Sequence, residues 1–206
     1  MYPLLETMRF ENGEFSNSEY HFRRMHQSVK TCFGQSLQFD PEKVLQEALS
    51  VMENKQGLFK FRLLYGNKTC QWEFIPYKLP GIKTLKPVVA NSIEYRCKYT
   101  DRSSLNNLRQ LKGEADDVLI VINGEVTDTS FANIVFYDGS RWVTPKNPLL
   151  KGTRRAALLD AGLITEASIT PDDLPNFEEV RIINAMIRLE DAEKVAFIDS
   201  STNATF

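Results

Sequence analysis

Asparagine–glycine pairs beside short apolar runs are the feature that most constrains how this chain can fold. Asn12-Gly13 follows the run at residues 3–10, and Asn123-Gly124 follows the aliphatic run at residues 117–122. Such pairs favour the left-handed turns that join two antiparallel strands. The first pair therefore predicts a β-hairpin, and the second predicts a turn directly after a strand.

Helices are predicted between these strands. Residues 17–33 repeat apolar side chains at helical spacing, Ser16 or Asn17 can cap the start, and Gly34 ends the run. The other predicted elements are a helix from Asp40-Pro41, a hairpin of residues 57–65 and 69–77 around Gly66-Asn67, strands at 87–91, 117–122, 134–137 and 141–144, a helix at 153–161, and short βα units to the end.

The order of these elements indicates an α+β fold in two modest domains. Strands and helices interleave without the regular βαβ rhythm of a dinucleotide-binding fold, and no GxGxxG is present. The stretch 77–86, with Pro80 and Gly81, is the best linker. At about 150 residues per domain, 206 residues allow two small domains, predicted at 1–81 and 82–206.

Composition excludes several classes of function. The formal net charge of −2 argues against a nucleic-acid binder that neutralises phosphates, and no run approaches the roughly 20 apolar residues of a membrane span. No basic and apolar leader opens the chain, and three scattered cysteines favour a reducing compartment, so a cytoplasmic protein is expected. His21 and His26 are five residues apart, off the spacing of a helical metal pair, so they are interpreted as surface or helix-face residues and no metal is expected.

Five segments carry the candidate chemistry. In chain order they are His21-Phe22-Arg23-Arg24-Met25, Tyr95-Arg96-Cys97-Lys98-Tyr99, residues 127–136 around Asp128 and Asn133, residues 148–155 around Gly152, and Ile182-Ile183-Asn184-Ala185-Met186. This set, in this order, resembles the class IV aminotransferases, the fold-type IV enzymes that use pyridoxal 5'-phosphate (PLP). The resemblance implies a two-domain fold with PLP at the domain interface, a small amino substrate and a homodimer.

The resemblance makes Lys98 the catalytic lysine, which forms a Schiff base with PLP and later moves protons. Asp128, five residues before Asn133, takes the place of the glutamate that usually pairs with the cofactor's ring nitrogen, and Asn133 supports it. The alternatives are a surface lysine for Lys98 and a turn aspartate after Asn123-Gly124 for Asp128.

The same resemblance implies the phosphate site. A helix N-terminus supplies backbone N–H donors for a phosphate, and arginine adds a guanidinium. The implied residues are Gly152, Thr153, Arg154, Arg24, Asn184 and Ala185. The alternatives are an ordinary glycine before a helix, a solvated Arg23-Arg24 face and a buried strand end at Asn184.

On the substrate side, Thr7 and Arg9 match the positions that line the pocket in the family, with Arg9 as a carboxylate ligand; a surface-strand arginine is the alternative. The family's tyrosine after the lysine is replaced by Arg102 and Ser103, and the chain is short at its front, so a trimmed N-terminal domain is expected. These departures favour 4-amino-4-deoxychorismate lyase, which releases 4-aminobenzoate and pyruvate, over a branched-chain or D-amino-acid aminotransferase. A family member that binds PLP without turnover stays an alternative.

Overall fold

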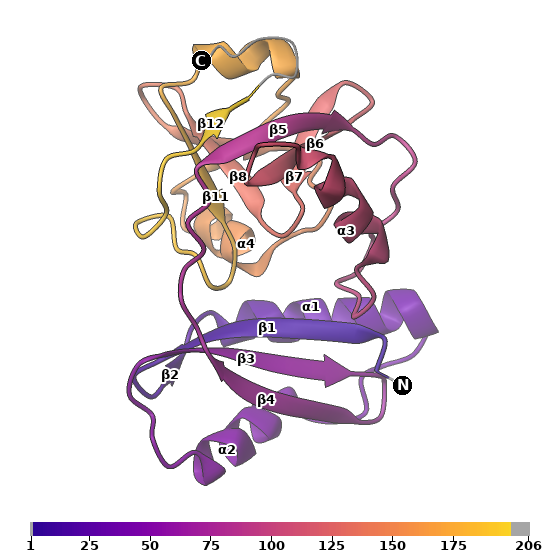
Figure 1. Cartoon of the computed structure of the whole chain (residues 1–206). Coiled ribbons are helices and arrows are strands. Elements are labelled where there is room, and N and C mark those ends of the chain that lie inside the picture. The colour runs from indigo at the N-terminus through magenta and orange to yellow at the C-terminus, as the bar shows by residue number, and fades with distance from the viewer. Residues whose placement is uncertain (1, 199–206) are drawn as a thin grey trace. The chain divides into compact units, whose positions relative to one another are not determined.

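The computed structural model describes residues 2–198, which form two compact units. The first unit contains the residues up to Leu79 together with Cys97–Asp101, and the second contains Pro80–Arg96 and the residues from Arg102 onward. Cys97–Asp101 thus belongs to the first unit although it follows the predicted linker. Each unit mixes helices and strands, as predicted for the chain (Figure 1).

The first unit is an antiparallel sheet with the strand order β2–β1–β3–β4. Its elements are β1 (Leu4–Glu11), β2 (Glu14–Phe15), α1 (Ser18–Phe33), α2 (Pro41–Val51), β3 (Leu58–Tyr65) and β4 (Cys70–Pro76). The hairpin predicted at Asn12-Gly13 is confirmed, because both residues have positive φ and Glu11 pairs with Glu14. The hairpin predicted around Gly66-Asn67 is confirmed by the pairing of β3 with β4.

Both helices pack on the same apolar face of this sheet. Alternate residues of β1 such as Leu4 and Met8 join a buried cluster with Val29 of α1 and Leu45 of α2. Fully burying such a side chain stabilises the fold by about 1.5–3 kcal/mol. The helix predicted at Asp40-Pro41 begins there, and the Asp40 carboxylate accepts the Glu42 N–H at 3.0 Å.

The start of α1 differs from the prediction in one detail. Asn17 stands at the N-cap position, but its side chain makes no capping hydrogen bond. The reason is its backbone, which is left-handed (φ 55°), whereas a capping side chain needs an extended residue. Gly34, also left-handed, ends the helix as predicted.

The second unit is built on an eight-stranded sheet, in the order β10–β9–β8–β7–β6–β5–β12 with β11 added beside β8. Its strands are β5 (Thr84–Val89), β6 (Asp117–Ile122), β7 (Glu125–Thr129), β8 (Asn133–Tyr137), β9 (Trp142–Pro145), β10 (Thr165–Ala167), β11 (Glu179–Ile183) and β12 (Ala196–Phe197). Its helices are α3 (Ser103–Arg109), α4 (Thr153–Asp160) and the short 3₁₀ helices η1 (Gln110–Lys112) and η2 (Pro171–Asn176).

Two predicted elements of the second unit need correction, and one strand was missed. Strand β5 begins at Thr84, inside the stretch assigned to the linker, because its residues pair with both β6 and β12. Pro87 lies mid-strand, beyond the two positions at which β12 pairs with β5. Strand β7 after Asn123-Gly124 was not predicted. The predicted βα units after α4 are wrong, since the described residues there form strands and a 3₁₀ helix.

Among residues 2–198, no helix combines the length and hydropathy of a membrane span.

Candidate functional site

A buried carboxylate organises the candidate site residues of the first unit. Glu6 lies on the apolar face of β1, in phase with Leu4 and Met8, and its side chain is fully buried. Its two oxygens accept hydrogen bonds from Arg24 Nε at 2.9 Å and Arg24 Nη2 at 2.5 Å, and His21 Nδ1 lies 2.6 Å from Oε2. Because His21 and Arg24 are three residues apart on α1, they share the face that meets β1.

The charges within this cluster follow from its burial. Burial opposes ionisation of Glu6, but Arg24 and His21 outweigh it and lower the pKa of Glu6 to about 2. Burial also lowers the pKa of His21, against the opposing effect of its contact with Glu6. At neutral pH, His21 is therefore neutral and donates its Nδ1–H to an ionised Glu6. The cluster carries one carboxylate and one guanidinium.

These contacts decide between the alternatives for the N-terminal helix. Arg24 keeps only 14% of its side chain exposed, so the interpretation of Arg24 as part of a solvated face is wrong. His21 was interpreted as a surface or helix-face residue, and its complete burial excludes the first of these two alternatives. His26 is exposed as expected, and Arg23 is exposed and lies over the Tyr20 ring at 4.3 Å.

Lys98 lies beside this cluster. The Leu5 N–H donates to the Lys98 carbonyl at 2.9 Å, and Tyr99 forms a bridge with Leu4, so the lysine's segment lies along β1. Lys98 is half-buried, and its positive charge contributes to the lowered pKa of His21. The structure therefore brings together Lys98 and Arg24, which the sequence places far apart.

Thr7 and Arg9 point to the other face of β1, since side chains alternate along a strand. The Arg9 guanidinium is paired with Glu11 at 3.0 Å and is only 3% exposed, so the interpretation of Arg9 as a surface-strand arginine is wrong. Thr7 is half-buried. Their predicted contact with substrate stays a prediction.

In the second unit, Asp128 and Asn133 face each other across the hairpin of β7 and β8. Asn133 Nδ2 donates to Asp128 Oδ1 at 2.7 Å and to the Leu150 carbonyl at 2.9 Å. The Leu150 N–H donates to Asp128 Oδ2 at 2.8 Å. Asp128 lies inside a strand and is only 4% exposed, so its interpretation as a turn aspartate is wrong.

The ionisation of Asp128 is finely balanced. Burial raises its pKa to about 7, against the opposing effects of the Leu150 N–H, the Asn133 amide and the more distant charge of Arg155. Each carboxylate oxygen has a second lone pair beyond the hydrogen bond described. A cation placed beside Asp128 would therefore find an acceptor and would favour its ionised form.

Gly152 precedes α4, where the sequence predicted a phosphate cradle. A Cβ at this position would lie 1.9 Å from Asn133 Oδ1, so only glycine admits the Asn133 amide. The alternative of an ordinary glycine before a helix is therefore wrong, because the close approach of the Asn133 side chain requires a glycine here. Thr153, the first residue of α4, is 4% exposed.

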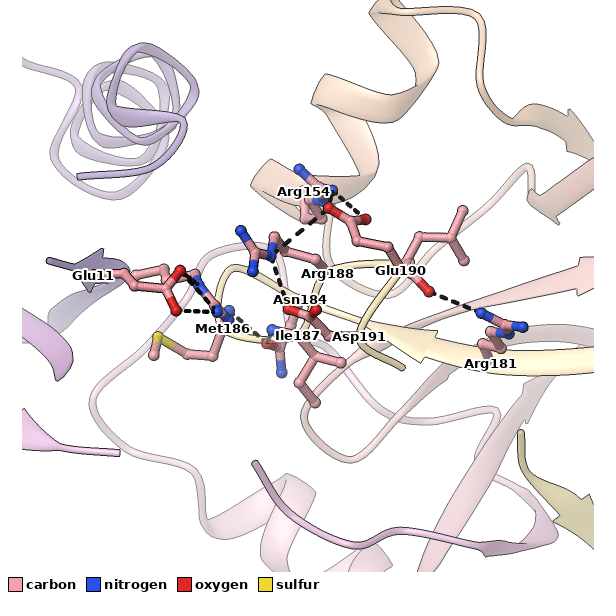
Figure 2. A network of polar contacts seen from close by, with 11 residues as sticks. Glu11, Arg154, Arg181, Asn184, Met186, Ile187, Arg188, Glu190 and Asp191 are labelled. Carbon is pink, nitrogen blue, oxygen red and sulfur yellow. Dashed lines mark hydrogen bonds and ion pairs between the residues drawn. The ribbon is translucent and has the colours of Figure 1, made fainter. Parts of the chain in front are cut away.

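Arg154 and Asn184 have protein partners of their own, which Figure 2 shows together. Arg154 Nη2 is paired with Glu190 at 3.0 Å, while its Nε is buried and has no hydrogen-bond partner among the described residues. Asn184 Oδ1 accepts the N–H groups of Met186 and Ile187 at 2.8 and 3.0 Å (Figure 2). Asn184 thereby shapes the turn that contains Ala185, and it is not merely a buried strand end.

Sequence reasoning missed Glu6, Leu150 and Arg155. Glu6 had a usable signal, because an acidic residue in the apolar phase of a strand must be paired if it is buried. Leu150 acts through its backbone, which leaves no trace in the side-chain pattern. Arg155 is 4% exposed and donates to the Pro145 carbonyl at 2.8 Å. No group of three or more metal-ligating side chains occurs in the described part of the chain.

The residues present fit PLP. The hydrogen bonds described for Asp128 come from the neutral Asn133 amide and Leu150 N–H, so a protonated ring nitrogen would add a directly bonded cation, and Arg154 retains a buried N–H donor near the start of α4. Members of the class IV family bind PLP, and distant relatives with the same fold, from Brucella abortus and Mycobacterium tuberculosis, have been solved with it.

Comparison with known proteins agrees with these observations. A "Putative aminodeoxychorismate lyase" of Schizosaccharomyces pombe is 30% identical over 202 residues, which cover 88% of this chain and 85% of that protein. An uncharacterized protein of Haemophilus influenzae is 39% identical over 188 residues, covering 90% of this chain and 98% of its own length. The crystal structure of a "putative 4-amino-4-deoxychorismate lyase" from Haemophilus somnus superposes with a TM-score of 0.87 at 37% identity, covering 92% of this chain and 98% of that one.

The fold is therefore a mixed α/β fold that matches class IV aminotransferase structures over nearly its full length. The sequence model of that family matches residues 3–190. The chain belongs to the class IV aminotransferase family.

Proposed function

We propose that the protein is a PLP-dependent lyase that converts 4-amino-4-deoxychorismate to 4-aminobenzoate and pyruvate. The observation that carries this choice is the likeness to the Haemophilus somnus protein of that name, which extends over 92% of this chain. The replacement of the family's tyrosine by Arg102 and Ser103 favours the lyase over the better-known aminotransferases. We further propose that PLP binds between the two units and that the protein acts as a homodimer.

When bound, PLP withdraws electrons from the bonds around the substrate's amino-bearing carbon. Lys98 would carry protons to and from the reacting atoms with its amine. Asp128, held by Asn133 and Leu150, would accept a hydrogen bond from the ring nitrogen and keep it protonated. The resulting ion pair would lower the pKa of Asp128 below its value of about 7.

The phosphate would be held from two directions. Backbone N–H groups at Gly152 and Thr153 begin α4, and the first turn of a helix favours an anion. Arg24 would add its guanidinium, already oriented by the bidentate contact with Glu6. Arg154 and the turn at Asn184 and Ala185 would complete this site.

Product analysis tests the proposal directly. Purified protein with PLP is given 4-amino-4-deoxychorismate without any oxo acid, and 4-aminobenzoate and pyruvate are measured. We expect equal amounts of both products, and none from Lys98→Ala. Lys43→Ala, a change at an exposed lysine of α2 outside the segments that carry the candidate chemistry, is the control and should retain turnover. Amino-group exchange with 2-oxoglutarate as the only activity would identify an aminotransferase, and PLP binding without either activity would identify a binding protein.

A further inference from the structure

The turn between β7 and β8 connects Asp128 to Asn133 and is closed by its own hydrogen bonds. The Thr129 N–H donates to the Ala132 carbonyl at 2.9 Å, and the Ala132 N–H donates to Thr129 Oγ1 at 3.1 Å. These bonds set the shape of the turn. They do not set its position relative to the rest of the sheet, which requires contacts from outside.

Thr129 pairs with Leu119 of β6, and Asn184 Nδ2 lies 3.5 Å from the Phe131 carbonyl, but the contacts with charged side chains are made by Ser130. Asp117, at the start of β6, accepts the Ser130 hydroxyl at 3.0 Å and the Ser130 N–H at 3.3 Å, both through Oδ2. Arg102 Nη2 donates to the Ser130 carbonyl at 2.8 Å. Every polar group of Ser130 is therefore bound by one of two charged side chains.

The contact between Asp117 and Ser130 is buried, and burying polar and charged groups costs folding free energy unless they are well paired. Asp117 is fully buried and Ser130 is 3% exposed. The other oxygen of Asp117, Oδ1, accepts no hydrogen bond from the described residues and has the Arg109 guanidinium at 3.6 Å. Both hydrogen bonds described for the buried Asp117 carboxylate are to Ser130, so this carboxylate fixes the position of the turn relative to β6.

Arg102 also has a particular place along the chain. It is the first residue after the segment Cys97–Asp101 of the first unit, and it stands four residues after Lys98. Its side chain is anchored to the turn that carries Asp128. The Arg102 guanidinium therefore connects two parts of the chain. Its backbone lies four residues after Lys98, and its side chain binds the turn that follows Asp128.

We propose that Asp117 and Arg102 are positioning residues of the cofactor site, and that they act through Ser130 to hold Asp128 within hydrogen-bond reach of the PLP ring nitrogen. Neither residue is assigned a contact with PLP or substrate. The inference rests on the proposed role of Asp128 and adds to it the residues that make Asp128 effective.

The test uses protein loaded with PLP that is labelled with ¹⁵N in the ring, because the resonance of that nitrogen reports whether it is protonated. We expect Arg102→Met and Asp117→Asn to move the resonance toward the unprotonated position and to lower kcat at least tenfold with little change in KM. Arg102→Lys keeps a donor for the Ser130 carbonyl and should restore most of both. Ser130→Ala keeps the backbone contacts and should have a smaller effect.

Arg141→Met is the matched control, since Arg141 is an exposed arginine of the same unit and should leave both readings unchanged. A thermal unfolding curve accompanies each variant. If Arg102→Met and Asp117→Asn bind PLP with an unchanged nitrogen resonance, the proposal is overturned, even where stability or kcat falls. If the unmutated protein binds no PLP, or binds it with an unprotonated nitrogen, then the proposed role of Asp128 fails, which is a distinct result.

Discussion

Asp128 gives the protein without cofactor a pH dependence of its own. In the unfolded chain this carboxyl loses its proton near 3.8, whereas in the fold it keeps the proton up to about 7. Between these values the folded state binds more protons, so the free energy of unfolding falls as pH rises. We expect Asp128→Asn to gain stability over the unmutated protein between pH 4 and pH 8, by up to roughly 4 kcal/mol for a shift of about three pKa units.

Urea unfolding of both proteins without PLP, at several pH values, measures this difference. Other titrating groups act equally on the two curves and cancel. Parallel curves from pH 4 to pH 8 would show that Asp128 is ionised as easily in the folded as in the unfolded chain.

Glu6 is expected to be the most costly carboxylate to neutralise in the first unit. Glu6→Gln removes the negative charge that pairs with the buried Arg24 guanidinium and replaces one of the two acceptor oxygens with an amide nitrogen. Breaking a buried ion pair costs about 3–5 kcal/mol of unfolding free energy. Glu73→Gln is the matched control, because Glu73 pairs with Arg62 on the same sheet at 2.6 Å but is 48% exposed. Its cost should stay below about 1 kcal/mol. Equal losses of unfolding free energy in the two variants would contradict the role assigned to Glu6.

At the scale of elements, the packing of the start of α4 against β8 requires a residue without a side chain at Gly152, next to Asn133. Gly152→Ala places a Cβ where Asn133 Oδ1 lies, so the Asn133 amide must move and its bond to Asp128 must weaken. Overpacking of this kind costs about 1–3 kcal/mol. Chemical denaturation should show that loss, and Gly66→Ala, whose Cβ meets nothing within 4 Å, should not.

A double variant isolates the cause. Asn133→Ala removes the amide that the new methyl group meets, so Gly152→Ala should cost less in that background than in the unmutated protein. Simple addition of the two losses would mean that the glycine is required for another reason.

The elements that sequence reasoning predicted correctly are those specified by neighbouring residues. The hairpin at Asn12-Gly13 needs two positive φ angles that this dipeptide adopts easily, and the start of α2 needs only Asp40 and Pro41. Strand β7 was missed although its partners β6 and β8 are its neighbours along the chain, because Val126 is its only apolar residue and no strand pattern results. The first residues of β5 were missed because one of their partners lies far away in the chain. Thr84, for example, pairs with Ala196.

The same division holds for the candidate site. The order of the motifs predicted Lys98, Asp128 and Gly152 as site residues, because the resemblance to the class IV aminotransferases rests on short local segments. It did not bring out their partners, because the Leu150 N–H reaches Asp128, and the Glu6 carboxylate reaches Arg24, only once the strands, helix and loops have come together. The local motifs thus predict the candidate residues, whereas their partners depend on the tertiary fold.

At the scale of the whole molecule, the proposed function requires both units to contribute to one cofactor site. Lys98 and Arg24 belong to the first unit, and Asp128 and Gly152 belong to the second. If PLP binds both sets, its addition should slow hydrogen exchange of backbone amides around all four residues, because a ligand that binds only the folded state suppresses local opening where it contacts the chain. Exchange followed by mass spectrometry with and without PLP measures this protection, and Lys98→Ala should weaken it in both units together. Protection confined to one unit would rule out a shared site, whatever the activity of the protein proves to be.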